Sequence, residues 1–159
     1  MIEARHPVSY THLSEGPHRA TIREERAIYS ATAHGRVPFI SAHDIAAAAA
    51  TALTAPVPPH ADYVLTGPEL LSYDEVAQRI SAVIGETITH HSLTFDELVA
   101  RHIANGLSEP YAQTLAFMDL IIADGAEDLI TDGLAQLVDE PPVTFLQFVS
   151  HNASVWNRP

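Results

Sequence analysis

Two amino-acid types are missing from this chain of 159 residues. It contains no Cys, and all eight of its basic residues are Arg, so Lys is absent as well. Without Cys there is no thiolate nucleophile, no disulfide and no Cys-ligated zinc site. Without Lys there is no Schiff base, no P-loop lysine and no Tyr/Lys proton relay. These absences exclude several catalytic mechanisms before any motif is considered.

Positive charge is also scarce. The eight Arg face 20 acidic residues, which gives a formal net charge of −12 at pH 7. A surface that binds phosphates or anionic lipids needs the opposite sign, so the composition argues against nucleic acid and membrane surfaces as partners. Hydrophobic residues make up 47% of the chain. That content supports one buried core, and the length favours a single domain over residues 1–159.

Long apolar runs and clustered glycines are lacking too. The nearest candidate, the Ala-rich stretch 45–52, is far shorter than the roughly 20 residues that cross a bilayer. Residues 1–9 carry charges and lack the apolar segment of a signal peptide. We therefore expect a cytoplasmic protein. The seven glycines stand singly, so there is no G-x-G-x-x-G turn on which a dinucleotide pyrophosphate could rest.

Helix starts are marked by a capping residue followed, three positions later, by an acidic residue. The three sites are Ser41–Asp44, Ser72–Glu75 and Thr94–Glu97. Each pairs a hydroxyl that can accept from a free backbone amide with a carboxylate near the positive helix end. The first helix should cover about 42–53. The second should end at Gly85 and the third at Gly106, because glycine adopts the left-handed conformation that closes helices.

Three short segments between these helices have the composition of strands. They are Val37–Ile40, Tyr63–Thr66 and Thr87–His91, with a charged helix around 19–29 before them and helices over 111–123 and 144–156 after them. This order predicts an α/β fold with a short, mostly parallel sheet and a helical subdomain. We expect the first two strands, joined by the alanine-rich helix, to be parallel and adjacent or nearly so, because a crossover of this length normally gives a right-handed parallel unit.

Candidate catalytic and metal residues are few. Ten His are present, but His90 and His91 are adjacent on an expected strand and should point to opposite faces. No H-E-x-x-H spacing occurs, and no G-x-S-x-G elbow supports a Ser/His/Asp triad. We therefore predict no metal site and assign no catalytic residue. The row of Tyr111, Phe117 and Met118 could line an apolar pocket, although such residues more often belong to a core.

Several runs resemble the NmrA-like atypical short-chain reductases. The runs are Ile28–Thr32, His34–Ser41, Asp44–Ala46, Tyr63–Glu69 and Ser72–Glu75. The likeness is greatest to the fungal ergot-alkaloid reductases, the festuclavine and agroclavine dehydrogenase group. It covers nearly the whole chain from about Leu13, including Pro141–Phe145 and Trp156. The resemblance implies the C-terminal half of a Rossmann-like, NmrA-type fold.

This resemblance also implies a function. It would be an NADPH-dependent reductase that acts on an iminium-type intermediate of indole (ergot) alkaloid biosynthesis, with a small-molecule substrate. Two departures stand out. The family's amino-terminal half with its glycine-rich loop has no counterpart here, and His12 in His12-Leu-Ser-Glu15 replaces the Asn of the family's Asn-Phe-Ser-Glu motif. Both suggest a gene fragment, a mis-called start codon or a truncated paralogue.

Other interpretations remain open at this point. The chain could be a cofactor-less module that binds a small molecule, or one that forms a homodimer or joins a partner chain through an exposed sheet edge. It could also be a non-functional remnant. From the resemblance we nominate His12, Tyr29, Phe39 and Ser41 as a substrate or cofactor wall. We also predict that the chain alone does not bind NADPH tightly.

Overall fold

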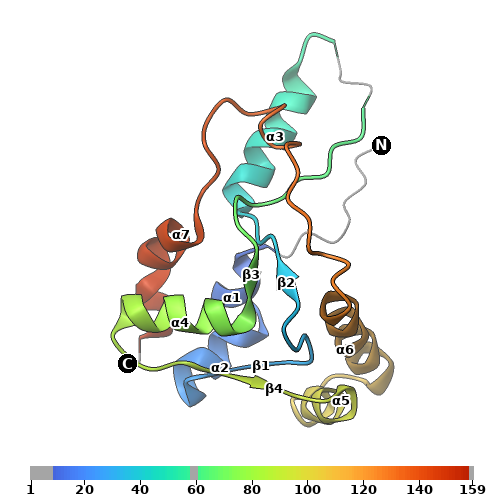
Figure 1. Ribbon diagram of the computed structural model, residues 1–159, viewed down its shortest axis with the longest axis vertical. Coiled ribbons are helices and arrows are strands. Elements are labelled where there is room, and N and C mark those ends of the chain that lie inside the picture. Colours follow the sequence, from blue (N-terminus) through green and yellow to red (C-terminus); the bar gives the residue numbers. More distant parts are fainter. Residues whose placement is uncertain (1–8, 58–60, 158–159) are drawn as a thin grey trace.

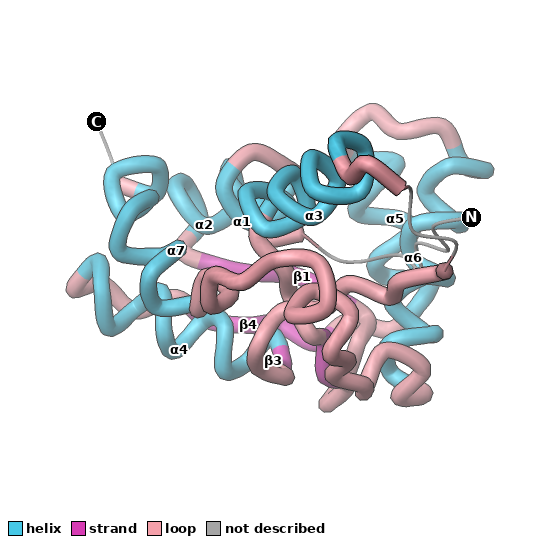
Figure 2. Tube along the Cα trace, turned by 90° about the horizontal axis from the view of Figure 1, so that it is seen from above, coloured by secondary structure: helices cyan, strands magenta, loops and turns pink. Residues whose placement is uncertain are grey.

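The computed structural model describes residues 9–57 and 61–157. In chain order the elements are α1 Thr11–Ser14, α2 Pro17–Glu25, β1 Ala27–Ser30, β2 Arg36–Val37, α3 Ala42–Thr54, β3 Leu71–Ser72, α4 Tyr73–Ile84, β4 Thr89–Ser92, α5 Phe95–Ala104, α6 Glu109–Ala123, α7 Phe145–Asn152 and the 3₁₀ helix η1 Ala153–Trp156. Helix α3 extends away from the other helices, whereas α5 and α6 pack together at one end (Figure 1). Figure 2 shows β1 and β4 at the centre, with α2 and α4 on opposite sides.

Two strand pairs are present among the described residues. Strands β1 and β4 are parallel, with Ala27 opposite Thr89 and Ser30 opposite Ser92. The connection between them passes through β2, α3, β3 and α4. Strands β2 and β3 form a short antiparallel pair. The predicted α/β fold class with a short parallel sheet is confirmed.

The predicted parallel pairing of Val37–Ile40 with Tyr63–Thr66 is wrong. Residues 63–66 form no strand, and Val37 instead pairs antiparallel with Leu71. Strand β2 ends at Val37 because Pro38 has no amide hydrogen to continue the ladder. The Pro38 carbonyl accepts a 3.1 Å hydrogen bond from the Gly67 amide. A Cβ on Gly67 would lie 1.7 Å from the Phe39 carbonyl oxygen, so only glycine permits this close approach.

The charged helix predicted around 19–29 is shorter than expected. Helix α2 ends at Glu25, and Arg26 adopts a left-handed conformation with φ of 57° before β1 begins. Such a conformation is unfavourable for a side chain with a Cβ, and tertiary contacts hold it. The Arg26 guanidinium donates to the Trp156 carbonyl at 2.7 Å and to both Glu86 carboxylate oxygens at 2.6 and 2.8 Å.

The other helices confirm the local signals. Capping boxes begin α4 at Ser72 and α5 at Thr94, and the Ser41 hydroxyl caps α3 by accepting from the His43 amide at 3.1 Å. Gly85 closes α4 with φ of 75°. The strand predicted at 87–91 is displaced slightly and appears as β4.

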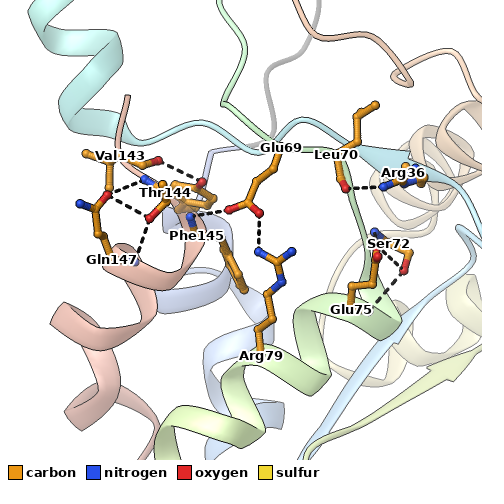
Figure 3. Close-up of polar contacts among 11 residues, drawn as sticks. Arg36, Glu69, Leu70, Ser72, Glu75, Arg79, Val143, Thr144, Phe145 and Gln147 are labelled. Carbon is orange, nitrogen blue, oxygen red and sulfur yellow. Dashed lines mark hydrogen bonds and ion pairs between the residues drawn. The ribbon is translucent and has the colours of Figure 1, made fainter. Parts of the chain in front are cut away.

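Glu69 joins the start of α7 to α4. One carboxylate oxygen accepts from the Phe145 amide at 3.0 Å, and the other forms an ion pair with Arg79 (Figure 3). The neighbouring capping box of Ser72 and Glu75 fixes the first turn of α4 in the same view. These bonds determine where Tyr73, the first residue of α4, is held.

The largest buried side chains form an aromatic core. Its members are Tyr10, Phe39, Phe145, Phe148 and Trp156. Their polar atoms are paired: the Tyr10 hydroxyl donates to the Val143 carbonyl at 3.2 Å, and the Trp156 indole N–H donates to the Leu13 carbonyl at 2.9 Å. These two bonds tie the last elements of the described chain to α1.

No helix within residues 9–57 and 61–157 is long and apolar enough to cross a membrane. The prediction that residues 1–9 lack the apolar segment of a signal peptide falls on 1–8, which lie outside the described residues, and on Ser9.

Candidate functional site

A pocket of about 650 Å³ lies beside the carboxyl end of β1. Its wall is formed by the α1–α2 region, by Tyr29 of β1, by Tyr73 of α4, and by α5 and α6. In open α/β folds ligands bind outside the carboxyl ends of parallel strands. The position alone therefore makes this pocket the candidate site.

One side of the pocket is apolar. It is formed by Leu98, Leu115, Met118 and Ile122 from the packed helices α5 and α6. Sites for small molecules combine such a wall with a few polar groups that set the orientation. The opposite side supplies those polar groups.

Two histidines lie close together where α1 leads into α2. The His12 and His18 rings are 5.0 Å apart in an edge-to-face arrangement. Desolvation lowers the pKa of His12, and it lowers the pKa of His18 to about 3, with further repulsion from His12, His102 and His90. Both rings are therefore neutral at pH 7, and each can offer one hydrogen-bond donor and one acceptor.

Tyr73 contributes a hydroxyl to the pocket. The residue is only 2% exposed, and its ring lies 5.6 Å from that of His18. Burial raises the pKa of the hydroxyl, so it stays protonated. The hydroxyl makes no hydrogen bond to the described part of the chain. Every fully buried side-chain N or O atom in that part has a hydrogen-bond partner, so the Tyr73 hydroxyl is not fully buried. The hydroxyl therefore opens into the pocket, where it can bond a ligand.

Asp119 of α6 supplies a carboxylate. Its Oδ2 accepts a 2.8 Å hydrogen bond from the Ala31 amide, just after β1. Burial raises the pKa of the carboxyl group to about 6, although the Ala31 bond acts in the opposite direction. The group is largely ionised at pH 7, and neither Arg nor Lys is among the residues that line the pocket.

Over 136 residues, 86% of its length, the chain is 46% identical to agroclavine dehydrogenase from Claviceps fusiformis. Over 149 residues, 92% of its length, it is 40% identical to festuclavine dehydrogenase from Aspergillus fumigatus. The chain is homologous to these dehydrogenases. It spans about half the length of the curated relatives it matches, and it corresponds to their C-terminal half.

The fold of the chain is shared with a solved reductase structure. The Citrobacter triphenylmethane reductase in complex with NADP(H) superposes with a TM-score of 0.78 at 26% identity, over 92% of this chain and 50% of that one. No profile of a known protein family matches the chain. The predicted resemblance and the C-terminal half of a Rossmann-like reductase fold are thus confirmed.

The four nominated wall residues lie in different places. His12 and Tyr29 line the pocket. Phe39 is 0% exposed and packs in the aromatic core, and Ser41 is 8% exposed at the start of α3. The structure brings only the first two to the pocket. A wall made by all four stays a prediction.

The sequence did not point to most of the pocket lining, and His18, Tyr73 and Asp119 are among the residues missed. His18 and Tyr73 carry no distinctive spacing, but Asp119 did have a signal, because it is the one charged residue in the apolar stretch 111–123. Within that stretch Met118 lines the pocket, whereas Tyr111 and Phe117 are exposed and join neither pocket nor core.

The remaining histidines form no metal centre in the described ranges, where no group of three His, Asp or Glu could hold an ion. His90 is held between Asp74 and Ser30, with ring nitrogens 3.0 and 2.8 Å from their side-chain oxygens. His91 stacks on Tyr29 with ring centroids 5.1 Å apart.

The pocket does not fit the phosphates of a dinucleotide. Pyrophosphate is bound by backbone amides at a glycine-rich strand-to-helix turn, often with a basic residue nearby. The glycines of this chain stand singly, and the described pocket lining contains no Arg or Lys. The lining suits instead a substrate that has an apolar part and a polar group able to form hydrogen bonds.

Proposed function

We propose that this chain is a single domain that forms the substrate side of an NADPH-dependent reductase. Its pocket would receive an iminium-type indole intermediate of ergot alkaloid biosynthesis. The observation that supports this most is the 46% identity to agroclavine dehydrogenase over 136 residues, 86% of this chain. The cytoplasmic location expected from composition stays a prediction.

The residues present have separate tasks in this proposal. The apolar faces of α5 and α6 bind the flat rings of an indole, since burial of aromatic surface supplies most of the binding energy. Tyr73 and the neutral imidazoles of His12 and His18 orient the polar end of the ligand. NADPH would supply the hydride when bound. Its phosphates require a glycine-rich strand-to-helix turn, which the singly placed glycines of this chain do not provide.

A cofactor-less binding module is the second candidate. The pocket has an apolar wall on α5 and α6 and polar groups opposite it, the combination that small-molecule sites use. In the described structure β1 and β4 have no strand partner except each other. Each therefore has a further edge at which a second copy or a partner chain could add a strand. A non-functional remnant is less well supported, because the buried side-chain N and O atoms in the described residues are all paired.

A chimera tests the reductase proposal. The C-terminal half of the Claviceps fusiformis agroclavine dehydrogenase is replaced by this chain, and NADPH oxidation is followed with an indole iminium salt. We expect turnover that requires both halves and falls when Tyr73→Phe is introduced. The matched control is Tyr111→Phe, which alters an exposed tyrosine outside the pocket. A folded chimera that binds NADPH but never oxidises it in the presence of the iminium would contradict the proposal.

A further inference from the structure

Resting on the proposed function, we propose that Asp119 is the counter-ion that selects a cationic ligand, an indole iminium, over a neutral indole of the same shape. The carboxylate would lie against the C=N group while the rings occupy the apolar side. Asp119 is thereby assigned as a specificity-determining residue.

The first argument is the charge of the pocket. Its described lining contains two acidic residues, Glu15 and Asp119, and no Arg or Lys. Arg101 lies over the ring of the pocket residue Tyr29, with its Cζ 3.5 Å from the ring centroid. Arg101 is already paired, because it donates to both carboxylate oxygens of Glu25 at 2.8 and 2.9 Å. The acidic residues therefore make the electrostatic potential inside the pocket negative, in keeping with the chain's formal charge of −12.

The second argument is how Asp119 is held. Its Oδ2 is fixed by the Ala31 amide, whereas its Oδ1 has no hydrogen-bond partner in the described part of the chain. Because no buried side-chain oxygen there lacks a partner, Oδ1 is accessible from the pocket. A carboxylate that is anchored on one oxygen and free on the other is already oriented for a positive group.

The third argument is the surrounding titratable groups. The other titratable residues of the described pocket lining are Glu15, His12, His18, His102, Tyr29 and Tyr73, and the Tyr29 hydroxyl donates to Glu25 at 2.9 Å. Burial lowers the pKa of all three imidazoles. They therefore do not neutralise Asp119 at pH 7. Below about pH 6 the carboxyl group takes up its own proton and attraction for a cation falls.

The test uses the 159-residue chain and two tricyclic indoles. An N-methyl dihydro-β-carbolinium salt carries a permanent iminium charge, and tetrahydrocarbazole is its neutral counterpart. Calorimetry should show tighter binding of the cation to the wild-type chain. In Asp119→Asn, whose amide oxygen can still accept from Ala31, cation affinity should fall roughly tenfold to hundredfold. Tetrahydrocarbazole should bind as before. Asp124→Asn, an exposed change at the end of the same helix outside the pocket, should leave both affinities unchanged.

The outcomes separate this inference from the proposed function. If the wild-type chain binds both indoles equally well, the counter-ion role is overturned while an indole pocket stands. If neither binds, both proposals fail. Should Asp119→Asn not fold, the wild-type chain decides the matter. Its preference for the cation should shrink between about pH 7.5 and about pH 5, across the pKa of Asp119 near 6. A preference that does not change with pH overturns the inference.

Discussion

The aromatic core and the pocket both border helix α1, but they differ in whether their polar side-chain atoms are hydrogen-bonded within the protein. In the core, the Tyr10 hydroxyl and the Trp156 indole N–H each donate to a backbone carbonyl. In the pocket, the Tyr73 hydroxyl and the His12 ring make no such bond to the described chain. Polar atoms that are paired internally hold a fold together, whereas those left unpaired at a pocket are available to a ligand.

The largest effect is expected from the core. Trp156→Ala removes a fully buried indole and its bond to Leu13. It should lower the free energy of unfolding by about 3–5 kcal/mol, measured by denaturant titration. Leu146→Ala on exposed α7 surface is the control, with an expected change within about 0.5 kcal/mol. Equal effects of the two variants would show that the end of the chain is not part of the core.

The next largest effect is the loss of folding stability at low pH that His18 causes. In the unfolded chain His18 binds a proton at its ordinary pKa of 6.5, whereas in the fold its pKa is about 3. Lowering the pH from 6.5 therefore favours the unfolded state, by at least about 1 kcal/mol. Asp119 opposes part of this loss, because its pKa is raised to about 6 in the fold and it binds a proton there first.

His18→Gln should flatten the fall of stability between pH 6.5 and 4, measured by denaturation at several pH values. His34→Gln, at an exposed position, should retain the wild-type slope. A slope that is the same in both variants would mean that His18 is protonated in the folded protein.

A matched pair of hydroxyl deletions tests the comparison most directly. Tyr10→Phe should cost about 1 kcal/mol, because the Val143 carbonyl loses its donor. Tyr73→Phe should change the free energy of unfolding by less than about 0.5 kcal/mol, since no protein bond is lost, but should weaken ligand binding. If Tyr73→Phe is the more destabilising change, its hydroxyl has a structural partner.

A similar loss of stability is expected from removing the cap of α4, the helix that begins with Tyr73. Ser72→Ala removes the cap of α4 and should lower the midpoint of thermal unfolding by an amount equivalent to about 1 kcal/mol. Ser72→Thr, which keeps a hydroxyl, is the control. An unchanged midpoint in Ser72→Ala would remove the capping role.

The smallest expected effect is no effect. Calorimetric titration of the 159-residue chain with NADPH should give no tight binding, because the glycine-rich turn and Lys are absent and the net charge repels a polyanion. A dissociation constant in the low micromolar range would show that this half binds the cofactor without the other.

The features that the sequence predicted best are those set by residues close together in the chain. The caps at Ser41, Ser72 and Thr94 and the stop at Gly85 were found because each depends on contacts within one helical turn. Strand β1 was missed because the left-handed turn at Arg26 is held by residues far along the chain. The pairing of β2 depended in the same way on a distant partner, Leu71.

In the pocket, too, residues brought together by long-range packing could not be predicted from the sequence. The family resemblance led to His12 and Tyr29, which do line the pocket. His18, Tyr73 and Asp119 lie on three different helices and meet only through packing, so no spacing could reveal them together. The lone carboxylate within the apolar stretch of α6 was the one available clue.

The bond from Trp156 to Leu13 gives this protein a built-in optical reporter. Trp156 is the sole tryptophan of the chain, and its indole is attached to the residue that follows His12 of the pocket. Its emission therefore comes from a single, defined location. A non-fluorescent ligand that displaces α1 when it enters the pocket will alter this emission, and occupancy can be followed in the unlabelled protein.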